Sequence, residues 1–161
     1  MALVEQIAKH FREVYFGGNW TSINLKDTLA EVTWREAITK VHNLNTIATL
    51  VFHINYYAEP VLKVLQGEPL NASDKLSFDL QPINSAQDWQ NLVIKALTEA
   101  ELLGVQIEKL DEVKLFEDFA DHKYGNYYRN IHGIIEHTHY HLGQISLIKK
   151  ILRKTKAAGE K

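Results

Sequence analysis

Apolar residues recur every three or four positions in four long stretches of the chain, which is the period of an amphipathic α-helix. The four stretches cover residues 2–15, 45–66, 86–103 and 126–153. The fourth carries a stripe made of Ile134, His137, His141, Ile145, Ile148 and Leu152. Four long amphipathic helices that bury such stripes against one another are typical of a helical bundle. We therefore predict an all-α fold, and within it a four-helix bundle.

The connections between these stretches differ in length. Residues 67–84 form a long crossover between the second and third helices, with a possible extended piece near Phe78. Shorter helices are expected at 26–31 and after the capping box of Thr33 and Glu36. The segment 107–119 fits either a short helix or a strand. We expect a single domain over residues 1–155 and a frayed tail over 156–161.

Composition narrows the classes of function. A chain of 161 residues can bury one sizeable core, and its net charge of -2 gives no basic surface for nucleic acid. It has no Cys, which excludes disulfides, thiolate metal sites and a cysteine nucleophile. There is no run of about 18 apolar residues and no signal-peptide pattern, so we expect a cytoplasmic protein without a membrane span.

The candidate chemistry lies in the histidines. His137 and His141 are four residues apart, so a helix places them on one face, inside the apolar stripe. Two buried imidazoles need a polar partner, and one metal ion satisfies both. His53 lies beside the apolar seam of the second helix; alone it fits a hydrogen-bonded residue at the edge of the core. Together, three imidazoles from two helices leave a metal with an open position, as in catalytic sites.

Two other metal motifs fit poorly. A zincin helix needs Glu directly after its first ligand, and this chain has Thr138 there. A di-iron bundle needs two Glu-x-x-His motifs, and Glu136 with His139 supplies one copy. His139 is two residues from either member of the pair, so we expect it to point away from them.

Two further residues are candidates for the surroundings of the site. Tyr57, one turn from His53, could orient a ligand or aid proton transfer, or could simply pack. Gln144, one turn beyond His141, could hydrogen-bond the ligand histidine or an unrelated group in the bundle.

The segment from Gly133 to Ile145, GIIEHTHYHLGQI, resembles the last-helix signature of the DinB-like superfamily. Trp20 before a short helix, the second-helix segment NTIATLVFHI and the ending Leu65-Gln66-Gly67 also resemble that family, in the same order. The resemblance implies a four-helix bundle, often a homodimer, in which His53, His137 and His141 bind a divalent metal, commonly nickel or zinc. Some members are S-transferases for low-molecular-weight thiols.

Three functions remain open from the sequence. The first is a metal-dependent transferase or hydrolase-like enzyme, in which a thiol or water at the open position ionises near neutral pH. The second is a metal-binding or stress-related scaffold without turnover. The third is a structural domain whose histidines are satisfied by hydrogen bonds. Imidazole ligands alone suit zinc, nickel, copper and iron, so the preference for nickel or zinc comes from the resemblance.

Overall fold

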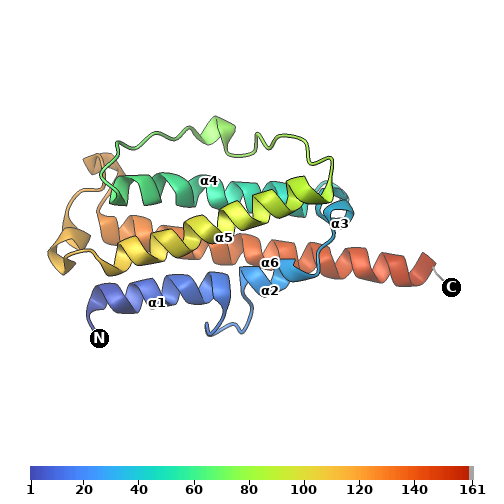
Figure 1. The fold of residues 1–161 in the computed structure, drawn as a ribbon, viewed down its shortest axis with the longest axis horizontal. Coiled ribbons are helices and arrows are strands. Elements are labelled where there is room, and N and C mark those ends of the chain that lie inside the picture. The colour runs from blue at the N-terminus through green and yellow to red at the C-terminus, as the bar shows by residue number, and fades with distance from the viewer. Residues whose placement is uncertain (160–161) are drawn as a thin grey trace.

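The computed structural model is all-α over the part of the chain that it describes (Figure 1). The backbone is described for residues 1–159 and the side chains for residues 1–155, so the tail expected over 156–161 lies outside the fully described residues. The α-helices are α1 (Leu3–Phe16), α2 (Leu25–Ala30), α3 (Trp34–Ile38), α4 (Ile47–Leu65), α5 (Ala86–Glu108) and α6 (Tyr127–Gly159).

Polar side chains fix where several of these helices begin. The side chains of Asn24, Thr33, Thr46 and Ser85 each accept a hydrogen bond from a backbone N–H in the first turn of α2, α3, α4 and α5. Such caps satisfy donors that have no partner inside the helix. The predicted capping box of Thr33 and Glu36 is confirmed. The cap of α4 is Thr46, the second residue of the stretch 45–66 predicted for this helix.

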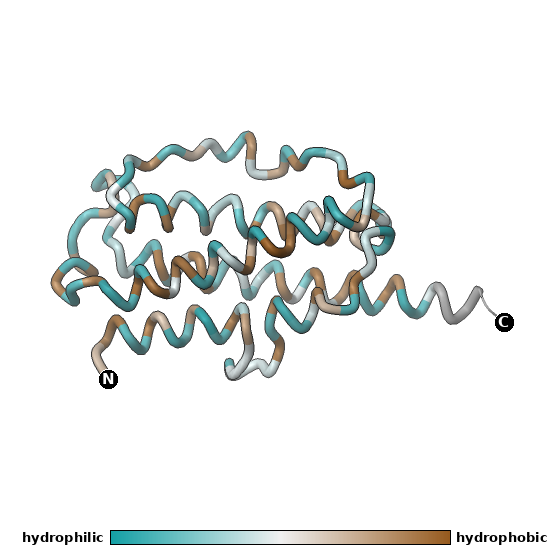
Figure 2. The backbone as a smooth tube through the Cα atoms, in the orientation of Figure 1, coloured by the Kyte–Doolittle hydropathy of each residue, from teal (hydrophilic) through white to brown (hydrophobic). Residues whose placement is uncertain are grey.

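The four long helices lie side by side, with α1 and α4 each packed against both α5 and α6 (Figure 1). Brown and teal segments alternate along these helices in Figure 2, as the periodic pattern requires. Their apolar faces meet in one core, whose largest fully buried side chains include Phe11, Tyr15, Leu50, Ile54, Leu103, Ile107, Ile131 and Leu142. The core encloses the inward face of α6, which carries the histidine pair.

The connections correct one expectation from the sequence and decide between two alternatives that it left open. The crossover between α4 and α5 runs along the outside of α4 (Figure 1) and contains a 3-10 turn at Asp74–Leu76, where an extended piece was considered. A second 3-10 helix, Glu112–Phe116, lies in the segment 107–119, for which the sequence allowed either a short helix or a strand. Among residues 1–159 there is no β-strand, and the single isolated bridge joins Asp118 and Asn126.

Among the described helices, α4, α5 and α6 have 18 or more residues. Within the described part of the chain, no helix combines the length and the apolar character that a membrane crossing requires.

Candidate metal centre

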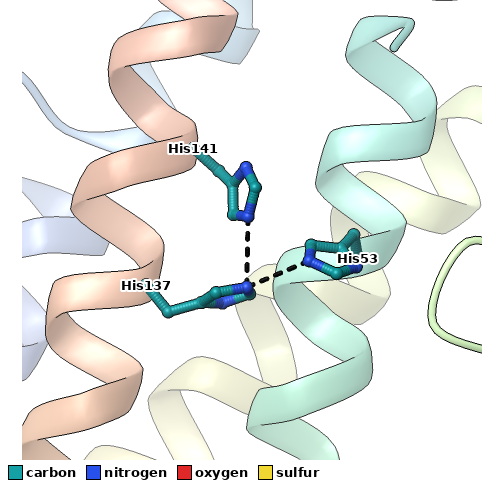
Figure 3. A group of neighbouring side chains, drawn as sticks. All are labelled: His53, His137 and His141. Carbon is teal, nitrogen blue, oxygen red and sulfur yellow. Dashed lines mark hydrogen bonds between the residues drawn. The ribbon is translucent and has the colours of Figure 1, made fainter. Parts of the chain in front are cut away.

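The structure brings the three predicted histidines together, His53 from α4 and His137 and His141 from α6 (Figure 3). The Nε2 atom of His137 lies 3.1 Å from Nε2 of His53 and 3.1 Å from Nε2 of His141. One nitrogen from each ring can be chosen so that all three lie within 4.8 Å of one another. His53 and His141 are buried and His137 is half-buried, so the cluster lies at the edge of the core.

One backbone oxygen and one side-chain oxygen fix which nitrogen is protonated in the two outer rings of the cluster, those of His53 and His141. Nδ1 of His53 lies 3.0 Å from the carbonyl oxygen of Ser77, which can only accept, so this nitrogen carries the proton. Nδ1 of His141 likewise donates to Oε1 of Gln144 at 2.8 Å. In a neutral imidazole the other nitrogen then carries a lone pair. Both Nε2 atoms that face His137 are therefore acceptors.

The hydrogen-bonding capacity of the cluster does not balance without a cation. If Nε2 of His137 is protonated, it can donate fully to His53 or to His141 but leaves the other lone pair facing it. The Nδ1 atom of His137 is buried and has no hydrogen-bond partner among the described residues. Two imidazole nitrogens on one zinc ion lie about 3.3 Å apart in tetrahedral geometry, close to the observed spacing. The three residues therefore fit a divalent metal with nitrogen ligands.

The electrostatics keep the rings in the form that binds metal. Burial, together with repulsion from His141 and His53, lowers the pKa of His137 to about 4. Burial also lowers the pKa of His53, against the opposing effect of its hydrogen bond to the Ser77 carbonyl. Both imidazoles are thus neutral at pH 7, which is the state that coordinates a metal ion.

The lowered pKa of His137 predicts how the stability of the metal-free protein depends on pH. In the unfolded chain a histidine has a pKa near 6.5. Between pH 6.5 and 4, His137 therefore binds a proton in the unfolded state but not in the folded state. The free energy of unfolding should fall as the pH is lowered through this window, by roughly 2 kcal/mol after allowance for solvent screening. Urea unfolding of chelator-treated protein at several pH values measures it.

The matched variants for this titration are His137→Gln and His122→Gln, the latter an exposed histidine outside the cluster. His137→Gln should flatten the pH dependence between 6.5 and 4, whereas His122→Gln should leave it close to that of the unsubstituted protein. An equally steep dependence in His137→Gln would show that another group is responsible.

Aromatic side chains fix the orientation of the rings. Phe78 stacks on His53 with ring centroids 3.9 Å apart and an interplanar angle of 12°. Tyr57 meets His53 and His137 edge-on, at centroid distances of 5.1 and 4.9 Å, and its hydroxyl donates to Oδ1 of Asp74 at 3.0 Å. Tyr57 therefore lies beside the cluster, where the sequence predicted it.

Sequence reasoning missed the part that the crossover plays. Ser77 and Phe78 both contact His53, although they follow it by more than twenty residues. Their signal in the sequence was weak: Phe78 belongs to a short apolar alternation with Leu76 and Leu80, which suggested an extended piece and not a contact with His53. The contact depends on how the crossover folds back on α4, which local propensity does not specify.

Gln144 provides a test of the hydrogen bond behind the cluster. Gln144→Leu removes the acceptor of the His141 Nδ1 proton and should lower metal affinity by about tenfold, because such partners fix the tautomer and ring orientation of the ligand. Gln90→Leu, at an exposed glutamine of α5, is the control and should bind metal as the unsubstituted protein does. Competition with a chromophoric chelator measures both, and equal affinities would contradict this role.

The remaining histidines of α6 lie apart from the cluster. His139 faces α1, where its ring centroid is 6.4 Å from that of His10, and His132 packs beside Tyr128. The expectation that His139 points away from His137 and His141 fits this placement. Thr138, at the position where a zincin has its catalytic glutamate, is fully buried and donates to the backbone carbonyl of Ile134.

Comparisons of the chain with known proteins found no relative. No protein-family model matches the chain, and neither the curated proteins nor the solved structures contain a match. The residues of the site itself are therefore what indicates the function of this chain.

Proposed function

We propose that this protein is a divalent-metal-dependent enzyme, with His53, His137 and His141 as the metal ligands and a low-molecular-weight thiol as substrate. The observation that carries the metal assignment is that Nε2 of His137 lies 3.1 Å from Nε2 of both His53 and His141, and that those two nitrogens are lone-pair acceptors. A divalent cation at this position would act as a Lewis acid and lower the pKa of an entering thiol or water.

The chain's own residues prepare the site for this chemistry. Ser77 and Gln144 hold the outer imidazoles in the tautomer whose Nε2 can coordinate. Burial is the largest of the effects that raise the pKa of the Tyr57 hydroxyl. This group therefore stays protonated and serves as a hydrogen-bond donor and not as a base. Because the chain has no Cys, the nucleophilic sulfur must come from the substrate.

We further infer that the packing of α1, α4, α5 and α6 is the four-helix bundle of the DinB-like superfamily. The support is the resemblance of the segment 133–145, together with a histidine cluster built from the two helices that the resemblance indicates. Zinc or nickel is the metal that this assignment implies. The homodimer and the cytoplasmic location stay predictions from the sequence.

The experiment that tests the proposed function combines metal analysis with a thiol assay. Purified protein should carry close to one equivalent of zinc or nickel, and it should accelerate the alkylation of a small thiol in a metal-dependent manner. A stoichiometric metal without acceleration for any thiol in a panel would favour a metal-binding scaffold. Absence of metal from protein purified without chelator, with no uptake when metal is added, would overturn both.

A further inference from the structure

A cavity of about 480 Å³ opens beside His137, between α4, the crossover and the first turns of α6. Its volume is in the range of pockets that hold small organic ligands. His137 and Tyr57 line it, as do Tyr124 and Arg129, which lies about two helical turns before His137 on α6. Val61, Leu70 and Ile134 contribute apolar surface to the same lining. A ligand that reaches the metal centre through this cavity therefore passes over apolar surface and ends near an arginine.

Arg129, Gly133 and His137 share one face of α6, because they are spaced four residues apart. The eight residues from Arg129 to His137 correspond to about 12 Å along the helix axis. Gly133 lies midway, and a Cβ atom added there would meet nothing within 4 Å. Glycine inside a helix costs roughly 1 kcal/mol relative to alanine, and no close packing requires it here. Its effect is to leave the space over this face open.

The guanidinium of Arg129 is available to a ligand. The described residues offer it neither an ion pair nor a hydrogen bond, whereas Arg12 and Arg153 are both paired with glutamates. Its aliphatic stem is held near Gly125, where an added Cβ would lie 2.8 Å from Cδ of Arg129. An arginine fork matches the geometry of a carboxylate.

The second charged residue of the cavity limits the ligand's charge. Asp74 also lines it, and its carboxylate already accepts the hydroxyl proton of Tyr57. One arginine and one aspartate together leave no excess positive charge. This balance suits a single carboxylate better than a phosphate dianion.

From this arrangement we propose that the substrate is an elongated thiol whose sulfur reaches the histidine cluster and whose carboxylate is bound by Arg129. The chain between the two groups lies over Gly133. This inference rests on the proposed function and adds the substrate class and a residue that determines specificity. Because Arg129 is exposed, its contribution should be modest and weakened by salt.

The test uses protein loaded with Co²⁺, in which a bound thiol is seen by its sulfur-to-cobalt charge-transfer absorption. The probes are 8-mercaptooctanoate and the neutral 8-mercaptooctanol, with sulfur and terminal group roughly 10 Å apart. The acid should bind roughly three- to tenfold more tightly than the alcohol, and this preference should shrink in high salt. Arg129→Gln should remove the preference, whereas Arg35→Gln, which removes the same charge on α3, should keep it.

A second variant tests the path over α6. Gly133→Leu should weaken both long probes by tenfold or more while leaving the Co²⁺ spectrum and the binding of 2-mercaptoethanol unchanged. Equal affinities for acid and alcohol, or a preference that survives Arg129→Gln, would overturn the inference although thiol binding itself remained. If 2-mercaptoethanol also gave no charge-transfer band, the proposed function would fall together with it.

Discussion

Removal of metal by a chelator is expected to lower the melting temperature of this protein by about 10 °C. A ligand present at a thousand times its dissociation constant stabilises the folded state by about 4 kcal/mol. In a domain of this size, each kcal/mol shifts the melting temperature by roughly 2–4 °C. The metal-free state also leaves at least one Nε2 lone pair of the cluster without a full hydrogen bond, which the metal would satisfy. Differential scanning calorimetry with and without chelator measures the shift.

The matched control for this measurement lies on the same helix. His139→Ala removes an imidazole that faces α1 instead of the cluster, so the metal-dependent shift should persist. His141→Ala should reduce the shift to almost nothing. If chelated and metal-supplemented wild-type protein melted at the same temperature, only the hypothesis of a structural domain without a metal would remain.

Much of this fold follows from local pattern. The 3.6-residue period identified the four long helices, and the four-residue spacing of His137 and His141 placed both rings on one inward face. These features depend only on the regular geometry of an α-helix, and the pattern of residues a few positions apart is enough to predict them. The meeting of His53 with the pair depends in addition on the packing of α4 against α6, two helices that α5 separates along the chain, and the periodic pattern does not specify that contact.

The rest of the candidate site depends on contacts that no local rule contains. Ser77 fixes the tautomer of His53 from the residue directly after the 3-10 turn of the crossover, a segment for which the sequence suggested an extended piece. The open space over Gly133 exists because the crossover and the turns before α6 stand off from that face. Irregular segments of this kind are set by tertiary packing, so their sequence period carries little information.

The second large effect concerns the chemistry of the site. His141→Ala is expected to lower metal affinity by roughly 100- to 1000-fold, because a set of protein ligands to zinc contributes several kcal/mol per ligand. With the metal lost, the acceleration of thiol alkylation should disappear. The loss should be clearest near pH 6, where a free thiol with a pKa near 8.5 is almost wholly protonated.

Iodoacetamide and a small thiol provide the readout for this loss. A carbon–sulfur bond forms, the carbon–iodine bond breaks, iodide leaves and the thiol proton passes to solvent. The protein has no Cys to compete for the reagent, so the rate of iodide release reports on the added thiol. His139→Ala should retain both metal and acceleration. An undiminished rate in metal-depleted His141→Ala would show that the three histidines do not activate the thiol, because that variant lacks both a ligand and the cation.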